Sequence, residues 1–135
     1  MKIKIEATIS APIPKVWSYW TKPEHIMKWN FAVPEWQCPR AENDLKVGGK
    51  YSARMEAKDG SFGFDFVATY VEVVDQKKIS YTMEDGRSAI TEFQTIGDKT
   101  KVTTIFDAEQ SNPVEMQQQG WQAILNNFQS YTERN

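Results

Sequence analysis

Apolar and polar residues alternate at the start of the chain. Between Lys2 and Ser10 the odd positions are Ile, Ile, Ala and Ile, and every even position is charged or carries a hydroxyl. Successive side chains of a β-strand point to opposite faces, so this period of two is typical of a strand with one buried face. We therefore predict a strand over this segment.

The spacing becomes helical in the next twenty residues. Pro14 suits a first helical turn, and apolar residues recur three and four positions apart from Val16 to Trp20. Thr21 and Glu24 then match a capping box, in which the Thr hydroxyl accepts from a backbone N–H and Glu24 reaches back to the Thr N–H. Two short helices are therefore expected, and the second carries Trp29.

Residues 30–49 show little periodicity. They contain Pro34, Pro39 and the pair Gly48-Gly49, and such residues interrupt regular elements. Only a short strand near Trp36 to Ala41 is predicted here. The segment is expected to form either a lid or an extended edge of a sheet.

Five alternating runs follow, each bounded by residues that favour turns. Asp59-Gly60, Asp85-Gly86 and Gly97-Asp98 lie between runs and suit tight hairpins, because these residues tolerate positive φ. Short hairpins join neighbouring strands, so a continuous antiparallel meander is predicted. The five runs are Tyr51 to Lys58, Phe62 to Val74, Lys77 to Glu84, Ser88 to Ile96 and Lys101 to Asp107.

The last predicted element is a long amphipathic helix. Asn112 is a favoured N-cap residue, Pro113 suits the first turn, and Glu115 complements the helix dipole. Gly120 costs about 1 kcal/mol relative to alanine inside a helix, which favours a close approach to a strand over one to a ligand. At about 1.5 Å per residue, the helix from Pro113 to Glu133 would span roughly 30 Å. Its apolar stripe comprises Val114, Trp121, Ile124, Leu125, Phe128 and Tyr131, and the polar remainder includes Gln117, Gln118, Gln122, Asn126 and Gln129.

This order of elements favours the α+β class, because it lacks the βαβ alternation of a parallel sheet. At 135 residues the chain is expected to form a single domain over residues 1–135.

Composition narrows the classes of partner. The net charge is −2 and the 16 basic residues are scattered, so no nucleic-acid partner is expected. No window approaches the roughly 18 apolar residues of a membrane span and no signal-peptide block is present, so a cytoplasmic location is expected. Cys38 is the only cysteine and His25 the only histidine, so neither a disulfide nor a Cys/His zinc site is predicted.

Few side chains qualify as catalytic candidates. His25 suits a general base, but stacking on Trp29 one turn later is the favoured interpretation. The residue order contains no catalytic triad, phosphate loop or metal cluster, so no catalytic residue, metal site or cofactor is nominated. Four charged strand residues fall on the phase opposite the apolar positions and are expected on the outer face, namely Arg54, Glu56, Asp65 and Glu92.

Short residue strings along nearly the whole chain resemble one bacterial family. They are Ala11-Pro12 with Val16-Trp17, Thr21-x-Pro23-Glu24-His25-Ile26-x-x-Trp29, Asp44-Leu45-x-Val47-Gly48-Gly49, Asp59-Gly60-Ser61, Tyr70-x-Glu72-Val73-Val74, Ile79-x-Tyr81, Asp85-Gly86-Arg87, Phe106-Asp107 and Gly120-Trp121-x-x-Ile124-Leu125-x-Asn127-Phe128. This pattern is similar to homologues of the activator of heat-shock protein 90 ATPase, within the START and Bet v (SRPBCC) superfamily. The resemblance implies a helix-grip fold, in which a curved antiparallel sheet of about six or seven strands surrounds the C-terminal helix and encloses a cavity.

The cavity that the resemblance implies leads to a binding hypothesis. We expect a small apolar or amphipathic ligand between the sheet and the C-terminal helix, in a monomer or homodimer. Two alternatives stay open: a co-chaperone-like interaction with a chaperone or other protein, and a cyclase or aromatase that uses Tyr81, Arg54 or His25. The candidate ligand-binding residues are Trp20, Trp29, Met55, Phe64, Phe66, Tyr81, Met83, Phe93, Trp121, Leu125 and Phe128.

Overall fold

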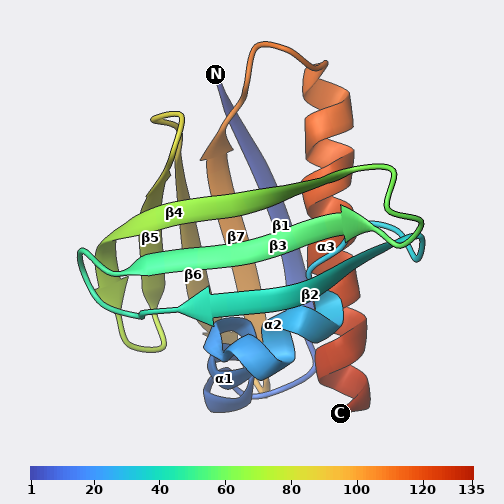
Figure 1. Cartoon of the computed structure of the whole chain (residues 1–135). Coiled ribbons are helices and arrows are strands. Elements are labelled where there is room, and N and C mark those ends of the chain that lie inside the picture. Colours follow the sequence, from blue (N-terminus) through green and yellow to red (C-terminus); the bar gives the residue numbers. More distant parts are fainter.

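The computed structural model describes all 135 residues, and seven strands form one antiparallel sheet in the order β1-β7-β6-β5-β4-β3-β2. Figure 1 shows that the sheet curls, because β2, β3 and β4 run from side to side in the view whereas β1 and β7 run from top to bottom. The helix-grip fold is therefore confirmed. The strands are β1 (Lys2–Ile9), β2 (Trp36–Asn43), β3 (Lys50–Ala57), β4 (Gly63–Val74), β5 (Lys78–Met83), β6 (Ser88–Ile96) and β7 (Lys99–Asp107).

The first strand pairs with the last. In β1, Ile3 lies opposite Phe106 and Ile5 lies opposite Thr104 of β7. Because side chains alternate along a strand, this register turns the apolar row of β1 toward the same interior face as Phe106. Ile3, Ile5 and Phe106 are all buried, so the predicted buried face of the first strand is confirmed.

The edge strand β2 accounts for most of the segment with little periodicity. It extends two residues beyond the predicted strand, to Asn43, and its pairing with β3 shifts register between Gln37 and Arg40. The shift contains Pro39, which has no N–H to donate to a ladder. This irregularity breaks the period of two, which explains why the sequence pattern was weak there.

Helices α1 (Ile13–Thr21) and α2 (Pro23–Trp29) are separated by Lys22 alone. The predicted capping box is wrong, because the N-cap of α2 is Lys22 and no side chain caps this helix. Thr21 instead ends α1, and its buried hydroxyl donates to the Trp17 carbonyl at 2.8 Å.

The long helix α3 (Val114–Arg134) contains 21 residues and runs beside β1 (Figure 1). Its N-cap is Pro113, so the prediction that Asn112 caps it is wrong. The Asn112 side chain donates to the Glu109 carboxylate instead. Gln117, expected on the polar remainder, is buried, and its amide donates to the carbonyls of Glu109 at 3.1 Å and Asn112 at 2.8 Å. This side chain therefore secures the turn that leads into α3.

Three further glutamines of α3 form hydrogen bonds with the free edge of β1. Their side-chain amides donate to backbone carbonyls that no neighbouring strand occupies. The pairs are Gln118 with Lys4 at 3.5 Å, Gln122 with Glu6 at 3.1 Å and Gln129 with Thr8 at 2.9 Å. The polar side of α3 thus satisfies a sheet edge that would otherwise be open.

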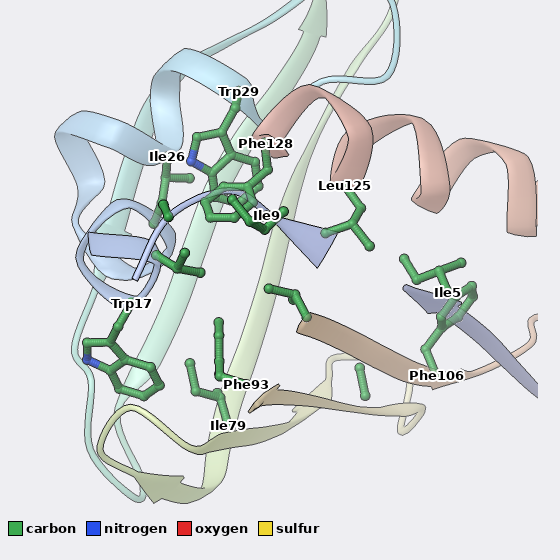
Figure 2. Packing of buried hydrophobic residues seen from close by; sticks show 14 of the residues in the cluster. Ile5, Ile9, Trp17, Ile26, Trp29, Ile79, Phe93, Phe106, Leu125 and Phe128 are labelled. Atoms are coloured by element: carbon green, nitrogen blue, oxygen red, sulfur yellow. The ribbon is translucent and has the colours of Figure 1, made fainter. Parts of the chain in front are cut away.

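The packed core runs along the inner face of the sheet, and a cluster of aromatic rings lies where α1, α2 and the C-terminal half of α3 meet the sheet (Figure 2). Phe128 is fully buried, and its ring meets those of Trp20 and Trp29 edge to face, with centroids 4.9 and 5.0 Å apart. Trp17 meets Phe93 of β6 in the same way at 5.2 Å. Such edge-to-face contacts are favourable and fill this half of the interior.

None of the helices combines the length and the apolar character that crossing a membrane requires.

Candidate functional site

A cavity of about 170 Å³ lies between α3 and the inner faces of β3, β4 and β5. Sixteen residues line it, and 13 of them are hydrophobic. The helix packs mainly against β1, so its other side stands away from β3 and β4. Phe66 of β4 and Trp121 of α3 reach toward each other across this space, with ring centroids 6.5 Å apart.

The structure brings eight of the eleven predicted ligand-binding residues to this cavity. The other three, Met83, Phe93 and Phe128, are buried in the packed core. Phe93 lies against Trp17 and Trp20, which fill the space that a ligand would need. The residues that line the cavity are Trp20, Trp29, Met55, Phe64, Phe66, Tyr81, Trp121 and Leu125.

Eight further lining residues were not predicted. The strand phase carried a signal for some of them, since Tyr51 shares its face with Met55 and Ile79 shares its face with Tyr81. The same phase places Thr91 with Phe93 and Thr104 with Phe106, but threonine is common on solvated strand faces, so these two were not proposed as lining residues. The full set is Ile5, Asn30, Tyr51, Tyr70, Ile79, Thr91, Thr104 and Ile124.

Most polar groups of the cavity wall bond to other protein groups. The Tyr70 hydroxyl donates to the Asn43 side-chain oxygen at 2.6 Å, and the Asn30 amide donates to the Tyr51 hydroxyl at 3.2 Å. The hydroxyls of Thr91 and Thr104 bond to each other at 2.8 Å. These bonds hold the polar side chains in fixed orientations.

The three tyrosines of the cavity stay neutral at physiological pH. Burial raises the pKa of Tyr51 well above its usual value, and neighbouring Tyr81 adds to this effect. Burial likewise raises the pKa values of Tyr70 and Tyr81. Each is therefore a neutral phenol that can donate or accept a hydrogen bond.

The charged strand residues lie outside the cavity, as expected. Arg54 bonds to Glu56 at 3.1 Å, and Asp65 accepts from Arg40 at 2.9 Å on the same outer face. Glu92 is exposed. Arg54 therefore does not line the cavity, and a cyclase mechanism cannot use it there without rearrangement.

His25 also lies outside the cavity, on a surface formed with Tyr19 and Tyr131. The expected stacking on Trp29 is wrong: the His25 ring stacks on Tyr19, with centroids 4.0 Å apart and planes inclined by 15°. Its Nδ1 hydrogen-bonds with the Tyr131 hydroxyl at 2.7 Å. Trp29 turns inward instead, where its Nε1 donates to the Tyr19 carbonyl at 3.0 Å.

Gly120 has no close neighbour, so the expected approach to a strand is wrong. A Cβ atom at this position would meet no atom within 4 Å. Residues four apart share a helix face, so Gly120 lies one turn before the lining residue Ile124. The glycine therefore borders the open side of α3, where no strand packs against it.

Comparison with known proteins places this architecture in a family. The solution NMR structure of the AHSA1-like protein from Aeromonas hydrophila is 43% identical, with a TM-score of 0.93 over 99% of this chain and 93% of that one. A solution structure from Cytophaga hutchinsonii is 53% identical, with a TM-score of 0.86 and the same coverage of both chains.

A crystal structure from Chromobacterium violaceum shares the fold at 22% identity, with a TM-score of 0.88 over 100% of this chain and 99% of that one. No curated protein sequence matches the chain. The family model described as "Activator of Hsp90 ATPase homolog 1-like protein" matches residues 10–133. That match covers more than half of the chain, and the chain therefore belongs to this family.

Proposed function

We propose that this protein binds a small apolar or amphipathic molecule in the cavity between α3 and the sheet, in the cytoplasm. The observation that carries the proposal is an interior space of about 170 Å³ with 13 hydrophobic residues among the 16 that line it. Protein cores are close-packed, and unfilled space costs stability. A preformed apolar space with a few polar groups is the usual form of a small-molecule site.

The size of the cavity limits the ligand. An apolar cavity of about 150 Å³ accepts benzene in a protein of another fold. The present cavity therefore suits about one aromatic ring with a short substituent. Phe64 lines the cavity and is 47% exposed, so the ligand would enter beside this ring, between the β3–β4 hairpin and α3.

The test combines native mass spectrometry with thermal unfolding. Gently purified protein should carry a co-purifying small molecule, or single-ring compounds should raise its melting temperature, because a ligand that binds only the folded state stabilises it. As a control, Ile124→Phe should fill part of the cavity, so that the protein stays folded but responds less to the same compounds. A protein that neither carries nor responds to any such molecule would contradict the proposal.

A co-chaperone-like role is the second candidate, and the description of the matched family favours it. Purified bacterial heat-shock protein 90 should then hydrolyse ATP faster when this protein is added, and the two proteins should co-purify. An unchanged ATPase rate without co-purification would remove this candidate.

A cyclase or aromatase activity has less support from the cavity. Of the three polar side chains that the sequence suggested for it, only Tyr81 is a lining residue. No carboxylate, histidine or lysine lines the cavity beside it, so the wall offers no conventional base for proton abstraction. Binding is therefore the function that the geometry favours.

A further inference from the structure

The cavity wall contains one tyrosine hydroxyl, that of Tyr81, which makes no hydrogen bond to the protein. Tyr81 lines the cavity from β5, where its ring packs against Tyr51, Phe66 and Tyr70 with centroids about 6 Å apart. The Tyr70 hydroxyl donates to the Asn43 side-chain oxygen, whereas the Tyr81 hydroxyl has no hydrogen-bond partner in the protein. Because Tyr81 lines the cavity and its hydroxyl has no partner in the protein, this hydroxyl is free to bond to a molecule that enters the cavity.

The wall of the cavity has no charged side chain. None of the 16 lining residues is Lys, Arg, Asp, Glu or His. Arg87 is near Tyr81 but does not line the cavity, because it bonds to the Asp85 carboxylate at 2.7 Å and to the Asp107 carbonyl at 3.3 Å. A charged ligand would therefore lose its hydration without gaining a counter-ion, which is strongly unfavourable.

We propose that the cavity takes an uncharged, single-ring molecule that presents a hydrogen-bond acceptor, such as a carbonyl oxygen, to the Tyr81 hydroxyl. This inference rests on the proposed binding function and names the ligand class. The apolar wall holds the ring, and the Tyr81 hydroxyl selects ligands that carry an acceptor. The Tyr51 hydroxyl accepts from Asn30 and so keeps one partner in the protein, and Tyr51→Phe is measured beside Tyr81→Phe to separate the two phenols.

Three probes of nearly the same shape test the inference. Acetophenone has a ring and a neutral carbonyl, α-methylstyrene replaces the carbonyl oxygen by a methylene group, and benzoate carries a charge. Dissociation constants for each would be measured at pH 7 by calorimetry, with wild-type protein and with Tyr81→Phe. The variant keeps the ring and its packing, and melting temperatures would verify that it folds.

Tyr81→Phe should weaken acetophenone binding about fivefold, as the loss of one hydrogen bond predicts, and should change α-methylstyrene binding less than about twofold. Wild-type protein should bind benzoate at least about tenfold more weakly than acetophenone. Tyr19→Phe is the matched control, since its hydroxyl donates to the Asn135 carbonyl outside the cavity. Tyr19→Phe should leave all three dissociation constants unchanged.

The outcomes separate this inference from the binding function on which it rests. If α-methylstyrene and acetophenone both bind but respond equally to Tyr81→Phe, or if benzoate binds as tightly as acetophenone, the inference is overturned while the binding function stands. A fivefold loss confined to Tyr51→Phe would likewise overturn the assignment to Tyr81. If none of the three probes binds, the proposed function fails and the inference fails with it.

Discussion

At the scale of single residues, Thr132 stands out because its hydroxyl is buried without a partner. Its side chain belongs to α3 and is fully buried. A helical threonine can donate to the carbonyl one turn back, as Thr21 does with Trp17. Thr132 makes no such bond, and an unpaired buried hydroxyl costs about 1–3 kcal/mol.

Replacing this hydroxyl with a methyl group should stabilise the protein. Thr132→Val keeps the branched shape and removes the unpaired group, so we expect the free energy of unfolding to rise by about 1 kcal/mol. Urea titration followed by circular dichroism would measure the change. Thr132→Ser is the control: it keeps the hydroxyl and loses a methyl group, so it should lower stability. A fall in stability for Thr132→Val would contradict this prediction, because it would mean that the hydroxyl forms a stabilising hydrogen bond in the folded protein.

At the scale of elements, α3 is joined to β1 by side-chain amides along one edge. Gln122→Ala removes the bond to the Glu6 carbonyl, and we expect it to lower the free energy of unfolding by about 1 kcal/mol. Gln119→Ala is the matched control, because Gln119 is exposed on the same helix and makes no side-chain hydrogen bond. Urea unfolding of both variants would measure the difference. If both variants changed the free energy of unfolding equally, the bond from Gln122 would contribute no more than a hydrogen bond from water to the same carbonyl.

Asp107, the last residue of β7, joins this strand to its two neighbours in the sheet, β1 and β6. Its carboxylate accepts from Lys2 of β1 at 2.5 Å and from the Ser88 backbone of β6 at 2.9 Å. These bonds, led by that from Lys2, lower the pKa of Asp107 to about 2. The ordinary value in an unfolded chain is about 4, so the folded state favours the charged form.

The stability that Asp107 contributes should therefore depend on pH. A lowered folded pKa gives stability that is fully present above pH 4 and is lost as pH falls toward about 2. Asp107→Asn should lower stability at pH 7 by about 1 kcal/mol, after allowance for solvent screening of this partly exposed pair. The difference from wild type should shrink between pH 4 and pH 2 in urea titrations. Asp98→Asn, which breaks no ion pair, should show no such dependence; a constant deficit for Asp107→Asn would contradict this account.

The elements themselves were predictable to different degrees. Strands with one buried face follow the period of two, so the five meander strands were predicted within a residue or two of their observed bounds. Helix caps were predicted wrongly at Thr21 and Asn112, because a capping motif specifies a local option and tertiary neighbours decide which hydrogen bond forms. In each case the side chain bonds to another partner, namely the Trp17 carbonyl for Thr21 and the Glu109 carboxylate for Asn112.

The candidate site was less predictable than the fold. Strand phase identifies inward residues such as Phe64, Phe66 and Tyr81, but it does not tell whether they meet a cavity or other side chains. Phe93 shows the difference, because it points inward like Phe66 yet Trp17 and Trp20 cover it. Which rings remain uncovered depends on where α3 crosses the sheet. That crossing is a property of the assembled molecule.

At the scale of the whole molecule, the interior has a packed half and an open half. In Figure 2, Trp29, Ile26 and Phe128 gather beside α2 in the packed half. The open half contains the cavity between β3, β4, β5 and α3. Close packing supplies stability, whereas a site for a small molecule needs unfilled space. We therefore expect the packed half to contribute most of the stability and the open half to bind the ligand.

Two phenylalanine truncations test this division. Phe128 is fully buried among Trp20 and Trp29, so Phe128→Ala should lower the free energy of unfolding by about 3–5 kcal/mol. Phe64 is 47% exposed at the cavity, so Phe64→Ala removes little buried surface and should cost about 1 kcal/mol or less. Phe64→Ala should nevertheless reduce the rise in melting temperature that single-ring compounds produce. Similar losses of stability from both truncations would mean that the interior behaves as one uniform core, because a ring beside unfilled space should contribute less than a ring enclosed by other side chains.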